Sequence, residues 1–294
     1  MTDPKSISIH DYTYELPEDR IAKYPLSERD ASKLLIYKNG LISERTFRSL
    51  PEELPPGSLL VFNNTRVIRA RLAFYRETGG RIEIFCTEPN EPADIQLLLQ
   101  QTKSCTMKCL VGNLKKWKPE EQLELKLFVH EQEIILKALY EAPISDLHCI
   151  RFEWTGEVTF AAVLEACGQM PLPPYMKREA ENGDSERYQT IFALEQGSVA
   201  APTASLHFTE PVLEDLKNKQ VVTDYVTLHV GAGTFKPVKT ETLGGHDMHR
   251  EEIAVPFQLV EHLASGKFKT VAAAGTTALR TLESLYWFGR KMLN

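Results

Sequence analysis

Cysteine pairs, long apolar runs and an excess of basic residues are all missing from this sequence of 294 residues. The five cysteines are odd in number and form no Cys-x-x-Cys pair, which favours free thiols in a reducing cytoplasm. No apolar run approaches the ~20 residues of a membrane span, and the first residues lack the basic-then-apolar pattern of a secretory signal. We therefore expect a cytoplasmic protein with no membrane association.

Two sets of residues raise the question of a metal site. Cys105 and Cys109 could supply two ligands of a metal site, but no second pair with ligand spacing follows in the sequence. We therefore favour the interpretation that both cysteines are buried free thiols. Four histidines, His207, His229, His246 and His249, are a rival zinc set, although their spacing fits no known ligand pattern. We predict no metal.

Positive charge is concentrated locally although the formal net charge is −6. That net charge argues against indiscriminate binding to nucleic acid. Two local basic runs nevertheless indicate either a solvated face or a nucleic-acid surface, and the sequence leaves both open: Arg66, Arg69, Arg71, Arg76 and Arg81, then Lys103, Lys108, Lys115, Lys116 and Lys118.

The stretch 198–235 concentrates small and polar residues around one predicted helix and one predicted strand. A loop of small residues presents His207 just before a helix that begins near Thr209. A strand over 221–230 then leads into His229 and a glycine-rich turn with Gly231 and Gly233. Each histidine alone is best explained as a satisfied, partly buried side chain. Together with Thr203, Ser205 and Thr234, the two loops predict a binding site.

The chain is longer than the ~150 residues of an ordinary domain, so we expect a second domain or an insertion. The predicted fold class is α/β, with the main domain (1–71 and 155–294) interrupted by a small antiparallel β-barrel over 72–154. Six short alternating runs predict the barrel: Arg81–Thr87, Ile95–Leu99, Thr106–Val111, Gln122–Val129, Glu133–Leu139 and His148–Trp154. Asn39-Gly40 predicts a hairpin, and a strand followed by Gly275 and Thr276 opens the last predicted helix.

Several motifs, read in order, resemble the S-adenosylmethionine:tRNA ribosyltransferase-isomerase family of queuosine synthesis. They span the chain from end to end and are rare in combination: Tyr24-Pro-Leu with Arg29-Asp30, 63–67 (NNTRV), 171–175 (PLPPY), 187–190 (RYQT), 201–208 (APTASLHF), 229–235 (HVGAGTF), Met248-His249 with Glu251, and 275–277 (GTT).

The resemblance implies transfer of the ribosyl part of S-adenosylmethionine onto 7-aminomethyl-7-deazaguanine at the tRNA wobble position, with loss of adenine and methionine. S-adenosylmethionine is thus a consumed substrate and tRNA a partner; no cofactor is expected, and we expect a monomer. Histidine suits the acid and base roles near neutral pH. The catalytic candidates, which the sequence does not rank, are His207, His229, His249 and Glu251.

Substrate contacts are expected from glycines, hydroxyls and aromatic rings, because an aromatic face favours a sulfonium cation and a helix start favours a carboxylate. These are Thr203, Ser205, Phe208, Gly231, Gly233, Thr234, Phe235, Gly275, Thr276 and Tyr188. Phosphates of tRNA are assigned to arginines, namely Arg66, Arg69, Arg71 and Arg187.

The sequence departs from the family pattern at four positions. Asn64 replaces a usual aspartate, Arg69 a proline, Lys33 an arginine and Ser205 a glycine. Loss of a carboxylate removes any base at that point, and Ser205 adds a side chain that would narrow a pocket. Relatives also continue beyond the position of Asn294, which predicts a shortened C-terminus. A catalytically impaired relative that binds tRNA or nucleoside without turnover is therefore the alternative.

Overall fold

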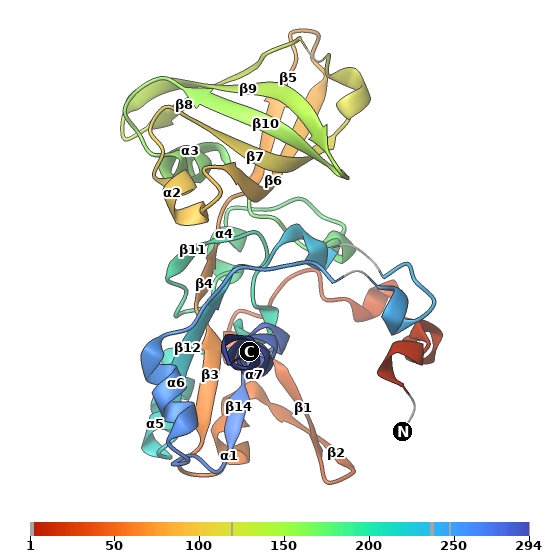
Figure 1. Cartoon of the computed structure of the whole chain (residues 1–294), viewed down its shortest axis with the longest axis vertical. Coiled ribbons are helices and arrows are strands. Elements are labelled where there is room, and N and C mark those ends of the chain that lie inside the picture. The colour runs from red at the N-terminus through yellow and green to blue at the C-terminus, as the bar shows by residue number, and fades with distance from the viewer. Residues whose placement is uncertain (1–2, 119, 236–237, 247, 294) are drawn as a thin grey trace.

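The computed structural model describes residues 3–118, 120–235, 238–246 and 248–293. Its chain forms two parts, a curled antiparallel sheet and a mostly parallel sheet with helices on both faces (Figure 1). No helix within the described ranges is long and apolar enough to cross a membrane.

The parallel sheet has the order β13 (Ile253–Ala254), β12 (Val222–Leu228), β3 (Leu59–Asn63), β14 (Val271–Ala273). β3 runs parallel to β12 and β14, and β13 pairs antiparallel with β12. β3 is buried along its whole length, as expected of a central strand covered on both faces.

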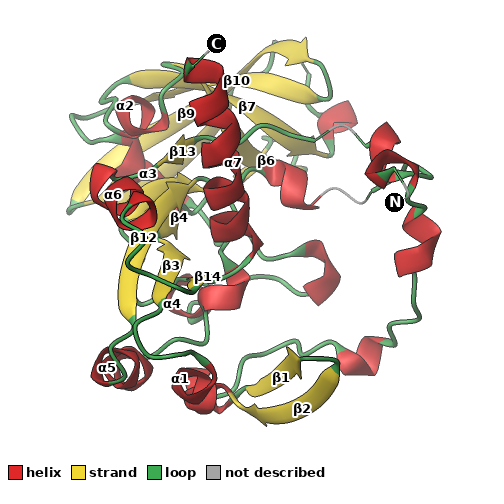
Figure 2. Ribbon diagram, turned by 60° about the horizontal axis from the view of Figure 1, so that its bottom comes forward, coloured by secondary structure: helices red, strands yellow, loops and turns green. Residues whose placement is uncertain are grey.

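Alternate side chains of β3 serve two different cores, since neighbouring residues of a strand point to opposite faces. Leu60 and Phe62 pack with α5 (Glu210–Asn218), next to α1 (Leu50–Glu53). Leu59 and Val61 pack against α6 (Phe257–Ala264) and α7 (Thr276–Met292). In Figure 2 the first pair of helices lies below the sheet and the second pair above it.

Two smaller strand pairs flank this sheet. β1 (Lys33–Lys38) and β2 (Leu41–Thr46) form the predicted hairpin, with Asn39 and Gly40 both at positive φ as a tight hairpin turn requires. β4 (Thr65–Val67) continues from β3 and pairs in parallel with β11 (Glu195–Ser198), which follows α4 (Asp184–Arg187).

The antiparallel sheet has six strands in the order β5-β6-β7-β10-β9-β8. It curls around one apolar core that also takes in α3 (Phe160–Cys167), and its edge strands β5 and β8 approach each other. The strands are β5 (Arg71–Tyr75), β6 (Arg81–Glu91), β7 (Ser104–Gly112), β8 (Leu123–Val129), β9 (Gln132–Ile144) and β10 (Leu147–Trp154). The α/β class with a small antiparallel barrel is confirmed. The division at residues 72 and 154 stays a prediction.

One predicted barrel strand was wrong. Ile95–Leu99 forms the short helix α2, because the Asp94 side chain accepts a hydrogen bond from Leu97 N at 2.9 Å and caps the first turn. Leucine and glutamine then favour a helix more than a strand. The sixth strand is instead β5, which pairs with β6.

Candidate functional site

The carboxyl ends of the three parallel strands meet at one edge, where open α/β sheets bind ligands. β3 ends at Asn63, β12 is followed by His229, and β14 is followed by Ala274 and Gly275. The Asn63 amide joins two strands here. Its oxygen accepts from Leu228 N and Thr65 N, at 3.0 and 3.2 Å, and its nitrogen donates to Leu228 O at 3.0 Å.

His229 has a partly buried imidazole that is positioned by a hydrogen bond at Nδ1. Its Nδ1 lies 2.9 Å from Thr65 Oγ1, and the Thr65 hydroxyl is also 3.4 Å from Glu195 O. Burial lowers the pKa of His229, because the charged imidazolium is less well solvated there. Gly197 packs against the ring, where a Cβ would lie 3.0 Å from His229 Nδ1. His229 is therefore an oriented, neutral imidazole near pH 7.

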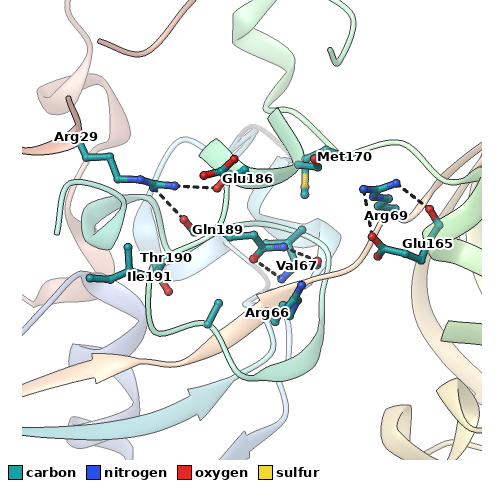
Figure 3. Close-up of a pocket in the computed structure, with 12 residues that line it drawn as sticks. Arg29, Arg66, Val67, Arg69, Glu165, Met170, Glu186, Gln189, Thr190 and Ile191 are labelled. Atoms are coloured by element: carbon teal, nitrogen blue, oxygen red, sulfur yellow. Dashed lines mark hydrogen bonds and ion pairs between the residues drawn. The ribbon is translucent and has the colours of Figure 1, made fainter. Parts of the chain in front are cut away.

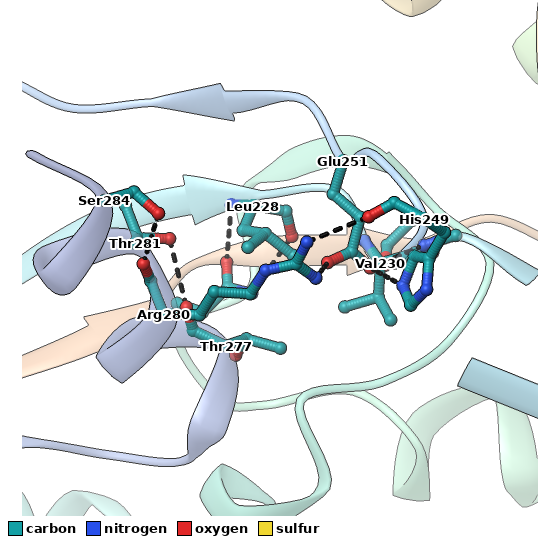
Figure 4. A network of polar contacts seen from close by, with 11 residues as sticks. Leu228, Val230, His249, Glu251, Thr277, Arg280, Thr281 and Ser284 are labelled. Carbon is teal, nitrogen blue, oxygen red and sulfur yellow. Dashed lines mark hydrogen bonds and ion pairs between the residues drawn. The ribbon is translucent and has the colours of Figure 1, made fainter. Parts of the chain in front are cut away.

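His249, Glu251 and Arg280 form a second polar group beside the same edge (Figure 4). The Glu251 side chain is only 5% exposed, and its Oε2 accepts from Arg280 Nη1 at 2.7 Å. Its Oε1 accepts from Gly231 N at 3.2 Å and lies 3.2 Å from His249 Nε2. That last contact is not an aligned hydrogen bond, since Nε2 is buried without a hydrogen-bond partner in the described part of the chain. Arg280 Nη2 also donates to His249 O at 2.9 Å.

The glycine-rich turn after His229 lies against the His249 ring. A Cβ on Gly233 would lie 2.5 Å from His249 Cγ, closer than real atoms approach, whereas a Cβ on Gly231 would meet nothing within 4 Å. Neither glycine has positive φ, so unusual backbone angles do not explain them. Gly233 is instead required for close contact with the imidazole.

Strand pairing explains why the two histidines meet. β13 pairs with β12, and the pairing continues one step further through His229 N and Glu252 O at 3.1 Å. A cavity of about 100 Å³ forms between the two segments, lined by His229, His249, Glu251, Gly231 and Gly233 among others. Five predicted site residues from two separate motifs are thus brought together.

A larger, more apolar cavity of about 530 Å³ is lined by the last two residues of the same turn, Thr234 and Phe235. It is lined by the stiff 171–175 segment, by Ala200 and Ala201, and by four predicted substrate residues: Tyr188, Thr203, Thr234 and Phe235. Its volume is that of a small-ligand site. Burial raises the pKa of Tyr188 to about 12, so its hydroxyl stays protonated at neutral pH.

Other predicted residues lie elsewhere. His207 lies beside Phe47, with its Nδ1 3.3 Å from Arg29 O, and lines neither of these two cavities. Phe208 is 3% exposed and belongs to the aromatic core with Phe62, so its ring is packed against protein rather than presented to a ligand. Ser205 is fully buried, which means its extra side chain narrows neither cavity.

Gly275 and Thr276 do begin α7, as predicted. Gly275 has φ +92 and approaches the Thr203–Ser205 turn, where a Cβ would lie 3.0 Å from Ala204 Cβ. Neither residue lines a described cavity. Their assignment to a carboxylate stays a prediction.

The four predicted phosphate-binding arginines are divided among three places. Arg66 and Arg69 line a polar cavity of about 540 Å³ (Figure 3), where Arg69 is bound to Glu165. Arg71 pairs with Glu83 at 2.7 Å. Arg187 donates to the carbonyl oxygens of Leu26 and Ser27, and so fixes the N-terminal segment.

The remaining departures from the family pattern are peripheral. The Asn64 side chain accepts from Thr227 Oγ1 at 2.7 Å and lines none of the described cavities. Lys33 is exposed on the hairpin and pairs with Glu44 at 3.2 Å. Among the residues that the structure describes, no group of three or more His, Cys, Asp or Glu is arranged to hold a metal ion.

Two residues of the site were not among the sequence candidates. Thr65 contacts His229, and Arg280 contacts Glu251; both partners were candidates from the sequence. Thr65 lies within the 63–67 motif, which was a usable signal. Arg280 lies one turn into α7, and only the packing of that helix against β12 brings it to Glu251.

An α/β sheet whose carboxyl edge carries two imidazoles, a buried carboxylate and adjoining cavities has the ligand-binding site typical of open α/β sheets, with groups suited to acid–base chemistry. The family model described as "Queuosine biosynthesis protein" matches residues 9–292, so the chain belongs to this family.

Relatives agree with that assignment. The chain is 40% identical over 280 residues to the S-adenosylmethionine:tRNA ribosyltransferase-isomerase of Aromatoleum aromaticum, covering 95% of this chain and 75% of the relative. It is 42% identical over 279 residues to the protein of the same name from Pelodictyon phaeoclathratiforme, covering 93% and 74%. The crystal structure of S-adenosylmethionine tRNA ribosyltransferase from Thermotoga maritima matches with 28% identity and a TM-score of 0.38, covering 93% of this chain and 71% of that one.

Proposed function

We propose that this protein transfers and isomerises the ribosyl moiety of S-adenosylmethionine onto 7-aminomethyl-7-deazaguanine at the wobble position of tRNA. The products are epoxyqueuosine in the tRNA, adenine and methionine. Relatives of about 40% identity carry the matching enzyme name. S-adenosylmethionine is consumed as a substrate in this proposal, and no separate cofactor takes part.

One observation carries the proposal. The turn from Gly231 to Phe235 lines two cavities, an apolar, aromatic one at Thr234 and Phe235 and a small one with two imidazoles at Gly231 and Gly233. A nucleoside with a reactive carbon beside its sulfonium needs this pairing of an apolar pocket with acid and base groups. In our proposal the adenosyl group occupies the larger cavity and its 5′-carbon faces the histidines.

The aromatic cavity suits a sulfonium nucleoside. Tyr175, Tyr188 and Phe235 offer ring faces, which attract a cation and stack on a purine. The Thr203 and Thr234 hydroxyls are available to ribose or base edges. Tyr188 remains neutral, so it adds a donor without a charge.

His229 is our candidate for the base that removes the 5′-proton. Its lowered pKa keeps it unprotonated near neutral pH. If the Thr65 hydroxyl donates to Glu195 O, Nδ1 carries the imidazole hydrogen and Nε2 keeps the free lone pair. His249, supported by the Glu251 carboxylate, is then the candidate that assists departure of adenine.

The alternative of binding without turnover rested on two features of the sequence, the expected shortened C-terminus and the loss of a carboxylate at Asn64. Because the Asn64 amide is bonded to Thr227 and lines no described cavity, that loss leaves the proposed reaction groups untouched. We further propose that the protein works as a monomer in the cytoplasm, where its tRNA substrate and free thiols are expected.

The direct test incubates the chain with S-adenosylmethionine and tRNA that carries the 7-aminomethyl-7-deazaguanine base, and measures adenine by chromatography. We expect adenine release that requires the tRNA. His229→Asn and His249→Asn should each reduce this release by about 10²-fold or more, whereas His207→Asn should retain it within about threefold. Equal activity of all three variants and the wild type would refute the assignment.

A further inference from the structure

The cavity that holds Arg66 differs in character from the two reaction cavities. Its volume is about 540 Å³, and its lining is polar, with Arg29, Arg66, Gln189 and Thr190 among the residues (Figure 3). The 187–190 segment lines both this cavity and the aromatic cavity, since Thr190 lines the first and Tyr188 the second. A ligand group in this cavity would therefore lie beside the proposed nucleoside site.

Thr190 lines this cavity and has a side-chain hydroxyl without a hydrogen-bond partner among the described residues. The residue is only 5% exposed, and its Oγ1 is buried without a hydrogen-bond partner among the described residues. A buried hydroxyl left unpaired costs free energy, so such groups in proteins nearly always have a partner. Thr190 lines the polar cavity, and an acceptor group bound there that reached the hydroxyl would satisfy it.

Arg66 brings an unpaired positive charge to the same cavity. Its side chain makes no ion pair or hydrogen bond within the described ranges, whereas Arg69 is held by Glu165 and Arg29 donates to four backbone carbonyls. The acids there are Glu165, which is already paired, and the exposed Glu186. A free guanidinium and an unpaired hydroxyl that line one cavity are a binding arrangement for an oxyanion.

We infer that Arg66 and Thr190 hold one backbone phosphate of the tRNA next to the modified nucleotide. This inference rests on the proposed function. A phosphodiester fits because it offers two charged oxygens, one for a guanidinium and one for a hydroxyl. The competing oxyanion is the carboxylate of S-adenosylmethionine, which would make the same contacts, and the experiment distinguishes the two.

The test measures tRNA binding at several salt concentrations for the wild type and for Arg66→Gln, Thr190→Val and Thr190→Ser. Each lost charge contact to phosphate lowers the slope of log affinity against log salt by about 0.7–1. Arg66→Gln should lose this much slope. Thr190→Val should weaken binding about fivefold with an unchanged slope, because a hydroxyl releases no counterion.

Thermal melting separates this role from a structural one. Because the Thr190 hydroxyl has no protein partner, Thr190→Val should melt at or above the wild-type temperature while binding tRNA more weakly. Thr190→Ser keeps the hydroxyl and should bind within about twofold of the wild type. Arg290→Gln, an exposed arginine near the end of α7 that lines no described cavity, is the matched charge control and should keep the slope.

The outcomes are distinguishable. An unchanged salt slope in Arg66→Gln, with normal tRNA-dependent adenine release, would overturn the phosphate site and leave the proposed function standing. A raised KM for S-adenosylmethionine with unchanged tRNA binding would assign the cavity to the carboxylate and also overturn it. If the wild type neither binds tRNA nor releases adenine, both proposals fail.

Discussion

Replacing Glu251 with glutamine tests the polar group beside His249 most sharply. The change keeps the size of the side chain and removes its charge. Both carboxylate oxygens are in use, Oε2 at 2.7 Å from Arg280 Nη1 and Oε1 at 3.2 Å from both Gly231 N and His249 Nε2. In the variant, the amide NH₂ must face either the guanidinium or the imidazole.

The expected magnitude follows from these contacts. A hydrogen bond to a charged group contributes about 1.5–3 kcal/mol and a neutral one about 1 kcal/mol. Arg280 is 38% exposed, so solvent screens part of its attraction and the lower end applies. We expect Glu251→Gln to lower the free energy of unfolding by about 1–2 kcal/mol, a fall in Tm of about 4 °C.

Activity should fall further than stability. If Glu251 orients His249 for acid or base work, its loss should lower kcat about 10²-fold and leave KM for S-adenosylmethionine within about twofold. The assay is steady-state adenine release with saturating tRNA, together with thermal melting. Glu283→Gln, an exposed acid on α7, is the control and should match the wild type. A wild-type kcat in folded Glu251→Gln would refute the proposed role.

Three further results are expected. Gly233→Ala should lower kcat at least about 10²-fold by displacing the His249 ring, whereas Gly183→Ala, whose added methyl meets open space away from the described cavities, should keep near-wild-type adenine release. Burial lowers the pKa of His229 below its unfolded value of about 6.5, so as the pH falls the unfolded chain binds a proton at this histidine before the folded chain does. The free energy of unfolding should therefore decrease as the pH drops from 6.5 toward the folded pKa. His229→Asn should remove this contribution to the pH dependence of stability, as measured by urea titrations at pH 5–8. Gly168→Ala should destabilise by about 3 kcal/mol or more in the same titrations, because its Cβ would overlap a backbone oxygen, and an unchanged midpoint would contradict this packing.

Local patterns predicted much of the fold. The Asn39-Gly40 turn and five barrel strands depend on neighbouring residues, and the structure contains them all. The Ile95–Leu99 run failed because a short run with four apolar residues fits a strand and a helix equally well. Its Asp94 cap decides for the helix.

The site was harder to predict because it depends on contacts between distant segments. His229 and His249 meet only through the pairing of β13 with β12, and Arg280 reaches Glu251 only through the packing of α7. His207 looked equivalent to His229 in sequence, but its ring turns toward Phe47. Residue type and spacing identified the pool of candidates, and side-chain direction selected among them.

A crystal structure with S-adenosylmethionine bound would test the central claim most directly. The account predicts the adenosyl group between Tyr188 and Phe235, with its 5′-carbon directed at the cavity that His229 and His249 share. An adenosyl group bound elsewhere, with both imidazoles remote from the sulfonium, would contradict it.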